Sequence, residues 1–573
     1  MGPQRGGCAL KKALCIVAAA VMLFISSCSY ECSYEGKSVL TENDRKRFEA
    51  VKTFTDNVLK HGRGDRYEKK SPLFANGINT ATGEHIRWTN YDGKSYVLCN
   101  MASQQNLFRT LAAMTNLTGD KNYKKAAMDA INFMFKNHVS KNGLIYWGGH
   151  AFIDLATQAT AAPSDEAKSH ELKNAYPYYD LMYEVDREAA SRFVRAFWGA
   201  HVVNWDRLEF NRHGRFTVNI KNEWARQPAD HPVFYETRSL TFINAASDLI
   251  YAAAVEYTKT GNRDALKWAR ELAFQYVRAR DPETGLGSYQ YTIYADASKD
   301  RTRYSGDRAR QQFYPELGEK ALEPNILLWG GEIYGDGALM QLYIAKKLGD
   351  DGRDFLEWTA DGLLAFARHA YVPEENRFKP MLTDGTDLTG FTIKRDGYFG
   401  SKGRTFERYG DDGRFLLSYI RAYEMTGNAE LWNTARSLAH GFDIGDVGTK
   451  PGESIRPNLE TNCSNARVLF AIVDLYNMTK NEGYLNLARR IGDNILAQHC
   501  HNGYFKYGPE YANAGFDMIE PYALLALHSV ITGRSDAVPP FFEGGGYTEG
   551  GLILPNGTKL HNAHEDDILR IKK

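Results

Sequence analysis

Cysteine is scarce in this sequence, with seven residues in a chain of 573. Four of them precede residue 33, so the rest of the chain contains only Cys99, Cys463 and Cys500. Scaffolds held together by disulfides carry a dense and even set of cysteines. We therefore expect stability to come from burial in a large hydrophobic core. One disulfide is possible among the three cysteines, and none is required.

The chain also lacks a net charge, because 70 Lys and Arg balance 70 Asp and Glu. This balance, together with a hydrophobic share of 43%, excludes an intrinsically disordered chain and a non-specific nucleic-acid binder. Length alone permits several domains or one large toroid or barrel.

The N-terminus has the pattern of a targeting segment. Lys11 and Lys12 precede an apolar run, 13–25, that is too short for a permanent membrane-spanning helix. The run ends in Ile-Ser-Ser-Cys at Cys28, which resembles the lipobox of bacterial lipoproteins, where the cysteine carries the lipid. We interpret 1–28 as a lipoprotein signal peptide and 29–42 as a tether; the alternative is an ordinary signal peptide. Both predict export, and the first predicts a membrane-anchored lipoprotein facing the periplasm or the cell surface.

Helical periodicity dominates the following residues, beginning near Thr41, which is placed to cap a first helix. Five times an amphipathic pattern ends in a short turn, usually Thr-Gly or Leu-Gly followed by Asn or Asp, and a second amphipathic pattern begins. These turns lie near residues 118, 260, 348, 426 and 479. Glycine supplies the left-handed residue that closes a helix, and Asn or Asp caps the next one. The repeat predicts a mainly α protein, an (α/α)6–7 toroid of helical hairpins over 43–536 with loops gathered on one face.

Two long insertions and the tail depart from the repeat. The segments 280–331 and 383–413 are rich in Arg and Lys, and each is read either as a binding edge for a polyanion or as solvated surface charge. The tail, 537–573, lacks a helical pattern. We expect it to be an arm packed on the toroid.

Three short motifs between residues 142 and 215 bring histidines together with glycines, aromatics and a carboxylate. They are YWGGH ending at His150, SHELK around His170 and Glu171, and NRHGR around Arg212 and His213. Two imidazoles and a carboxylate are the ligands that Mn, Fe, Ni or Zn prefer, whereas calcium and magnesium favour oxygen. The alternative is that these are ordinary hydrogen-bonded or surface histidines.

A helical toroid on an exported chain with these motifs resembles a polysaccharide lyase, most closely the family two pectate lyases. The resemblance implies one divalent transition metal held by His150, Glu171 and His213, with Arg212 as the catalytic base. It also implies an acidic polysaccharide or oligosaccharide substrate, such as pectate. A looser resemblance is to the family thirty-eight glucuronan and alginate lyases.

Such enzymes cleave uronic polymers by β-elimination, in which a base removes the C5 proton and the C4 oxygen leaves. A cation that neutralises the neighbouring carboxylate stabilises the enolate as it forms. Because arginine is almost always charged, ordinary acid–base chemistry favours Lys173, Tyr176, Tyr178 or Tyr179 over Arg212 as the base.

The sequence also suggests residues that orient a metal ligand or bind the substrate. If residues 150–154 are helical, Asp154 shares a face with His150 and orients its imidazole. Trp147, Trp205 and Tyr178 are candidates to stack on sugars, and Arg238 is placed to pair with a substrate carboxylate. Each is equally read as a structural residue.

Three other functions compete with the lyase. The two-His-one-carboxylate set also occurs in non-haem iron oxygenases, but on β-rich barrels. A helical toroid is compatible with a glycoside hydrolase acting on unsaturated uronides, which would use aspartates. An exported lipoprotein could also be a glycan-binding module without catalysis.

Overall fold

The computed structural model describes residues 40–573 apart from 164–167, 222–223, 228–238 and 292–307. Contacts divide the chain after Val39, and only the unit Leu40–Lys573 is described below. The predicted signal peptide and most of the predicted tether therefore lie outside the described residues. Within them, no helix is both long and apolar enough to cross a membrane.

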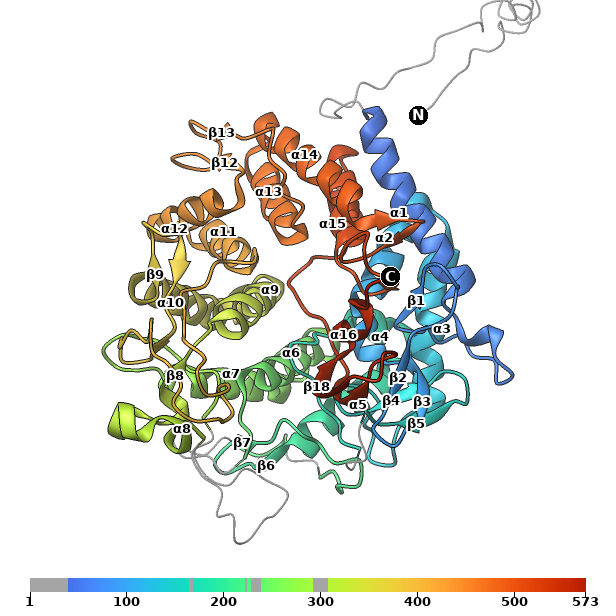
Figure 1. Cartoon of the computed structure of the whole chain (residues 1–573), viewed down its shortest axis with the longest axis horizontal. Coiled ribbons are helices and arrows are strands. Elements are labelled where there is room, and N and C mark those ends of the chain that lie inside the picture. Colours follow the sequence, from blue (N-terminus) through green and yellow to red (C-terminus); the bar gives the residue numbers. More distant parts are fainter. Residues whose placement is uncertain (1–39, 164–167, 222–223, 228–238, 292–307) are drawn as a thin grey trace, which may run out of the picture. The chain divides into compact units, whose positions relative to one another are not determined.

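Fourteen helices in the described unit pair up and close a ring (Figure 1). Six of the pairs are hairpins of consecutive helices, and the seventh joins the first helix of the unit to a helix near its C-terminal end. The inner helices are α2 (Gln105–Thr118), α4 (Tyr179–Val185), α6 (Ile243–Thr260), α9 (Ala338–Leu348), α11 (Arg414–Thr426), α13 (Ala466–Thr479) and α15 (Glu520–Ile531). Their outer partners are α3 (Lys121–Asn137), α5 (Arg187–His201), α7 (Arg263–Arg278), α10 (Arg353–His369), α12 (Ala429–Ala439), α14 (Glu482–His499) and α1 (Glu42–His61). Contacts of α15 with α2 and with α1 join the two ends of the described unit. The toroid predicted from the repeat is confirmed.

The turn chemistry explains the hairpins. Gly119, Gly261 and Gly427 have φ of 81°, 76° and 68°, the left-handed conformation that ends α2, α6 and α11. Asp120 and Asn262 then accept hydrogen bonds from the first turns of α3 and α7. At the turn that lacks glycine, Lys480 takes the left-handed conformation at φ 55°. The five predicted turns are thus confirmed in position. The turn near 348 differs in detail, because Gly349 has φ 61° and ψ −126°, outside the left-handed helical region, and no side chain caps α10.

Burial distinguishes the inner helices from the outer ones. Residues 243–256 of α6 are all buried, and so is nearly all of α15, whereas α7 buries one face and exposes the other. The inner ring therefore supplies the large core that replaces disulfides. The three cysteines of the described residues, Cys99, Cys463 and Cys500, are free.

Short strands lie among the loops. A four-stranded antiparallel sheet has the order β2 (Arg87–Thr89), β3 (Ser95–Cys99), β4 (Phe152–Asp154), β5 (Ala159–Ala161). Two-stranded pairs join β1 (Gly77–Asn79) to β16 (Asn513–Gly515), β6 (Val202–Asn204) to β7 (Glu209–Phe210) and β8 (Ile326–Leu327) to β11 (Met381–Leu382). The remaining pairs are β9 (Tyr371–Val372) with β10 (Arg377–Phe378), β12 (Gly445–Asp446) with β13 (Arg456–Pro457) and β14 (Cys500–His501) with β15 (Tyr504–Phe505).

The C-terminal arm forms the hairpin β17 (Glu549–Ile553) and β18 (Lys559–His564), followed by the short helix α16 (Glu565–Leu569). The prediction of a non-helical arm was wrong for this last segment, where three acidic residues, Glu565, Asp566 and Asp567, occupy the first turn of the helix. The hairpin contacts β2 of the four-stranded sheet.

The two basic insertions pack on each other. Helix α8 (Arg308–Leu317) of the first contributes Phe313 to a small apolar cluster that also contains Ile393 and Phe406 of the second. Several of their arginines form ion pairs: Arg310 contacts Glu319, and Arg395 contacts Glu316. These partly exposed pairs fit the alternative interpretation, solvated surface charge. Arg301 and Arg303 lie outside the described residues.

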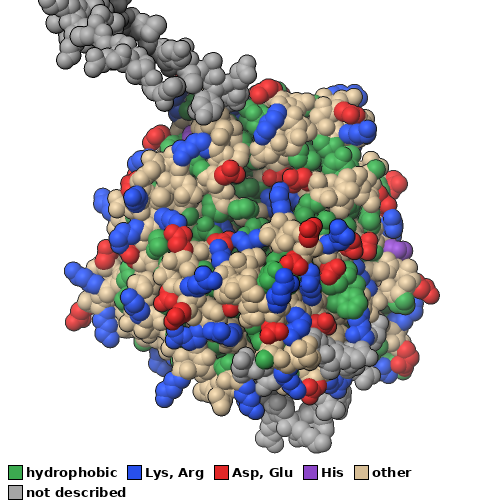
Figure 2. Space-filling model, turned by 180° about the vertical axis from the view of Figure 1, so that it is seen from behind, with side chains coloured by type: hydrophobic (Ala, Val, Ile, Leu, Met, Phe, Trp, Pro, Cys, Tyr) green, Lys and Arg blue, Asp and Glu red, His purple; other side chains and the backbone are tan. Residues whose placement is uncertain are grey.

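Figure 2 shows basic and acidic side chains interspersed over the face opposite to that of Figure 1. This distribution agrees with the zero net charge of the chain.

Candidate metal centre

Three loop segments, one from each sequence motif, lie side by side and are joined by isolated β-bridges. Gly148 bridges Glu171, His150 bridges Ser169, and His170 bridges Gly214. The N–H groups of His170 and Gly214 each donate to the other residue's carbonyl at 2.8 Å. These bridges bring the three sequence motifs together.

Glycines allow this close approach. Gly148 has φ of 105°, and a Cβ added there would lie 2.0 Å from the Glu171 carbonyl oxygen. A Cβ on Gly149 would lie 2.4 Å from Glu171 Oε2. The packing of this loop against Glu171 therefore requires both glycines of YWGGH, Gly148 against its backbone and Gly149 against its side chain.

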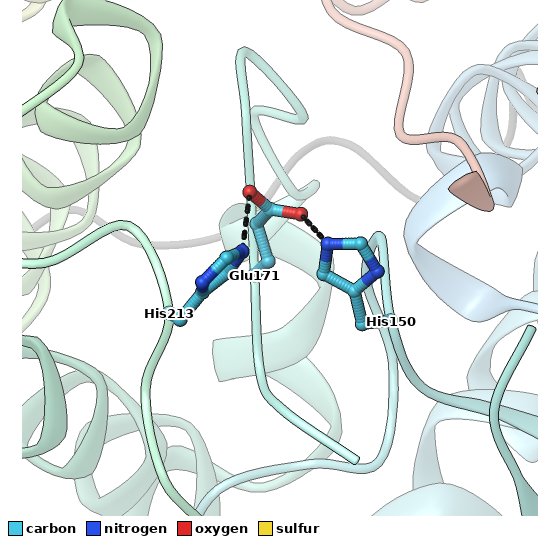
Figure 3. A group of neighbouring side chains, drawn as sticks. All are labelled: His150, Glu171 and His213. Carbon is cyan, nitrogen blue, oxygen red and sulfur yellow. Dashed lines mark ion pairs between the residues drawn. The ribbon is translucent and has the colours of Figure 1, made fainter. Parts of the chain in front are cut away.

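Glu171 stands between the two histidines (Figure 3). His150 Nε2 lies 3.0 Å from Oε2, and His213 Nε2 lies 3.5 Å from Oε1. One ligand atom from each of the three residues lies within 4.8 Å of the others. The structure thus brings together the three residues that the family resemblance implied as metal ligands.

Two cations also face Glu171. Arg212 Nε lies 3.2 Å from Oε1, and Lys173 Nζ lies 3.7 Å from Oε2. Burial alone would raise the pKa of the Glu171 carboxyl, but the charges of Lys173 and Arg212 outweigh it and hold that pKa well below its usual value. Glu171 is therefore a carboxylate in the folded protein.

His150 and His213 differ in their surroundings. Burial favours neutral His150, but the charge of Glu171 outweighs burial and raises the pKa of that imidazole. At His213 burial dominates and lowers the pKa. His150 Nδ1 lies 3.2 Å from the Glu549 carbonyl oxygen, which can accept only from an Nδ1–H. Nε2, the nitrogen that faces Glu171, is then the one left to bind a metal.

His170 has a different role from the other histidines of the motifs. Trp147 Nε1 donates to His170 Nε2 at 2.9 Å, and His170 Nδ1 lies 2.8 Å from His201 Nε2. His201 Nδ1 in turn lies 2.8 Å from the carbonyl oxygen of Asn211. Burial lowers the pKa of His170 well below its usual value and that of His201 to about 3, so this buried chain is neutral.

Three of the five predicted candidates for the base, Arg212, Lys173 and Tyr178, occupy different environments. Arg212 lies against Glu171 with its guanidinium 4.8 Å from the centre of the Phe242 ring. Lys173 is buried; burial lowers its pKa, but Glu171 and other charges outweigh this and raise that pKa above its usual value. Burial also raises the pKa of Tyr178, whose ring lies 5.3 Å from the guanidinium carbon of Arg109. The pKa directions of Lys173 and Tyr178 argue against a neutral lysine or a tyrosinate as the base.

Tyr176 and Tyr179 are fully buried. Burial raises the pKa of both hydroxyls well above the usual value for tyrosine. Neither presents the exposed oxygen that a base needs.

Two of the three predicted sugar-stacking residues, Trp147 and Trp205, are buried as well, whereas Tyr178 is partly buried. Trp147 is fully buried and donates to His170. Trp205 is 9% exposed and packs on Trp198 and Trp268. This burial argues for structural roles in both cases. Arg238 lies outside the described residues.

The prediction that Asp154 orients His150 was wrong. Residues 152–154 form strand β4 rather than a helix, and Asp154 Oδ1 accepts from the Val97 N–H at 2.9 Å. The carbonyl group beside His150 belongs to Glu549, which sequence reasoning missed.

The C-terminal arm supplies two further residues that were missed. Glu549 Oε2 lies 2.5 Å from Lys173 Nζ, and the Tyr547 ring centre lies 4.6 Å from the same nitrogen. The only signal in the sequence is the glycine-rich GGGYTEGG, which resembles the glycine and aromatic content of the other site loops.

The donor set fits a divalent transition metal. Both oxygens of Glu171 are buried, and neither accepts a hydrogen bond of good geometry from the described residues. Buried carboxylate oxygens in this state call for an explanation. Two imidazole nitrogens facing one carboxylate suit Mn, Fe, Ni or Zn.

Fold and site together define a class of protein: an α/α toroid with a two-histidine, one-glutamate site on its loop face. The chain belongs to the periplasmic pectate lyase family, whose model matches residues 71–551. It is an enzyme, a pectate lyase, as the motifs predicted, and membership in this family selects the lyase over the hydrolase and the non-catalytic module.

A relative supports the same assignment. The chain is 30% identical over 518 residues to the pectate disaccharide-lyase of Dickeya dadantii (strain 3937), covering 87% of this chain and 92% of that protein. Solved structures are more distant. A D-mannose isomerase matches with 11% identity and a TM-score of 0.40, covering 70% of this chain and 87% of that chain. A cellobiose 2-epimerase of Bacillus thermoamylovorans also has 11% identity, with a TM-score of 0.39 over 84% and 98%.

Proposed function

We propose that the chain cleaves a polygalacturonate-like polymer by metal-assisted β-elimination at the site formed by His150, Glu171 and His213. The main support for a bound metal is the buried Glu171 carboxylate, which faces two imidazoles and accepts no hydrogen bond of good geometry from the described residues. A divalent cation bound there would act as a Lewis acid on the substrate carboxylate.

Arg212 is the proposed base, on the strength of the family resemblance and of its place beside Glu171. In the structure the Glu171 carboxylate favours the charged guanidinium, 3.2 Å away. A cation held by His150, Glu171 and His213 would offset the charge of that carboxylate and weaken this preference. Arg212 then has to lose a proton before it can accept one from C5.

Lys173, which the sequence analysis considered as a base, has a substrate-binding role in this proposal. Because neighbouring carboxylates keep it charged, it serves as a fixed cation that pairs with a substrate carboxylate. It lines a cavity of about 680 Å³ together with Tyr547. This volume lies within the range of pockets that hold small ligands.

Trp329 is the proposed sugar platform of that cavity. Its side chain is 39% exposed and lies 4.9 Å from the guanidinium carbon of Arg414. An exposed indole beside an arginine offers an apolar face and a cation to an acidic sugar. Trp147 and Trp205 are buried and present no such face to a sugar.

We propose that the protein is exported to the periplasm or cell surface and anchored through a lipid on Cys28. The lysines, apolar run and Ile-Ser-Ser-Cys ending of the N-terminus support this proposal. A Cys28→Ala variant is expected to leave the membrane fraction. If it remains there as fully as the wild type, the anchor is not on Cys28.

The reaction is tested with purified protein on polygalacturonate, glucuronan and alginate. We expect ultraviolet absorbance of 4,5-unsaturated products to rise on polygalacturonate and a chelator to abolish the rise. Absence of any rise on all three polymers would contradict β-elimination. A full rate in chelator, with no metal in the protein, would contradict the metal centre.

The base is tested with Arg212→Gln, and exposed Arg215→Gln is the matched control. Loss of a general base typically slows catalysis by about 10²–10⁴-fold. We expect this loss in kcat at position 212 with metal content unchanged, and a near-wild-type rate at position 215. A wild-type kcat for Arg212→Gln would leave the base elsewhere.

A further inference from the structure

Glu549 contacts the candidate metal centre through three of its groups. Its N–H donates to the Gly149 carbonyl at 2.9 Å, and its own carbonyl faces His150 Nδ1 at 3.2 Å. Its carboxylate lies 2.5 Å from Lys173 Nζ. The first residue of strand β17 is thus tied to two of the three motif loops.

The position of Lys173 depends on this contact. Its ammonium lies between two carboxylates, 2.5 Å from Glu549 and 3.7 Å from Glu171. Lys173 belongs to the same motif as Glu171, only two residues along the chain. If the Glu549 carboxylate lost its charge, the nearest remaining anion for Lys173 would be Glu171.

A lysine paired closely with Glu171 would compete with a metal. The ammonium would occupy a lone pair of the carboxylate and add positive charge beside the imidazole ligands, where Arg212 already contributes one cation. In the structure the ammonium instead lies closer to Glu549 than to Glu171.

We propose that Glu549 is a positioning residue that withholds Lys173 from Glu171 and fixes the tautomer of His150, so that the site remains open to a divalent metal. The C-terminal arm is thereby part of the metal centre, although it contributes no ligand. This inference rests on the proposed metal site. Tyr547, whose ring centre lies 4.6 Å from Lys173, limits the other directions open to the ammonium.

The test measures metal binding to the full chain stripped of metal, by calorimetric titration with Mn²⁺ and Ni²⁺, without substrate. Glu549→Gln keeps the backbone carbonyl that faces His150 and removes only the charge. Residues that orient metal ligands typically contribute 10–100-fold in affinity, so we expect binding weakened by at least about 10-fold. Exposed Glu188→Gln, on α5, is the matched control and should bind as the wild type does.

A second change separates competition by Lys173 from a general structural effect. In Glu549→Gln/Lys173→Met the competing ammonium is gone, so we expect affinity to return to within about threefold of the wild type. Lys173→Met alone should bind at least as tightly as the wild type. This variant provides a test even if Glu549→Gln fails to fold.

The outcomes are distinct. Wild-type affinity in Glu549→Gln, no recovery in the double variant, or weaker binding by Lys173→Met would each overturn the role of Glu549. If the wild-type protein binds neither metal, the proposed metal centre fails first, and this result is visible before any variant is compared.

Discussion

His170, His150 and His213 show how similar residues in neighbouring motifs take different roles. His170 is enclosed by Trp147 and His201, which use both of its ring nitrogens. His150 and His213 each turn Nε2 toward the Glu171 carboxylate. In His170 both ring nitrogens contact other side chains of the core, whereas His150 and His213 keep Nε2 directed at Glu171, where a metal could bind.

The buried histidine chain makes stability depend on pH. The pKa of His201 is about 3 in the folded protein, against 6.5 for an unperturbed histidine. Between these values the unfolded chain takes up a proton that the folded protein refuses. The stability from neutral His201 is therefore fully present above pH 6.5 and is lost as the pH falls toward 3, at up to about 1.4 kcal/mol per pH unit.

We expect the free energy of unfolding, measured in urea, to fall below pH 6.5. The fall should be shallower in His201→Gln, which has no titrating group there. Carboxylates also titrate in this range, so the informative quantity is the difference in slope between the two proteins. Equal slopes would mean that His201 takes up its proton as readily in the folded protein as in the unfolded chain.

The sequence predicted the ligand residues but not all their neighbours. His150, Glu171 and His213 stand in recognisable motifs, and the family resemblance orders them. Glu549 was missed because its contact with His150 spans 399 residues, and no local pattern records such a distance. Asp154 was assigned wrongly because the spacing of four residues was read as helical where a strand forms.

At the scale of elements, the site depends on loops that run alongside one another with little space between their backbones. Gly148 is the tightest position, because it combines a left-handed φ of 105° with the 2.0 Å approach of an added Cβ to the Glu171 carbonyl. Loss of that approach would separate the loop carrying His150 from the loop carrying Glu171.

Gly148→Ala should therefore lower both stability and metal affinity. The left-handed strain of a non-glycine residue costs about 1–2 kcal/mol, and the steric clash adds to it. Gly119→Ala is the matched control, because Gly119 has φ of 81° and open space around an added Cβ. We expect similar strain there but unchanged metal binding, measured by calorimetric titration. Equal loss of affinity in both variants would contradict a specific role for Gly148.

Hairpins differed in how visible they were from the sequence. The five hairpins whose turns contain Thr-Gly, Leu-Gly or the related Thr-Lys were predicted, whereas the hairpin of α4 and α5 was not. A single residue, Asp186, both ends α4 and caps α5, and α4 is only seven residues long. Because one residue forms the whole connection, the sequence there contains no glycine or cluster of polar residues that would predict a turn.

At the scale of the whole described unit, the ring is closed by helices from its two ends. Helix α1 packs on α14 and α15, so the first helix of the ring is the outer partner of the last. No repeat in the sequence predicts this pairing, because it depends on the number of hairpins needed to close the ring. The seventh pair is thus formed by helices from the two ends of the described unit, not by a hairpin.

Arg47 anchors this closure. Its side chain is buried and forms ion pairs with Asp44 of α1 and with Asp493 of α14. Asp44 is itself buried and also contacts Arg489 of α14. Removing one partner from a buried ion pair leaves an uncompensated charge and costs about 3–5 kcal/mol.

We expect Arg47→Met to lower the free energy of unfolding by about 3 kcal/mol, at the lower end of that range because Arg489 still faces Asp44. Lys52→Met, which removes an exposed pair with Asp56 on the same helix, should change it by less than about 1 kcal/mol. Urea unfolding is followed by circular dichroism and by tryptophan fluorescence. If closure by α1 stabilises the ring as one unit, both signals shift together. Faster proteolysis within α1 at an unchanged unfolding midpoint would instead mean that α1 opens independently and that six hairpins hold the ring by themselves.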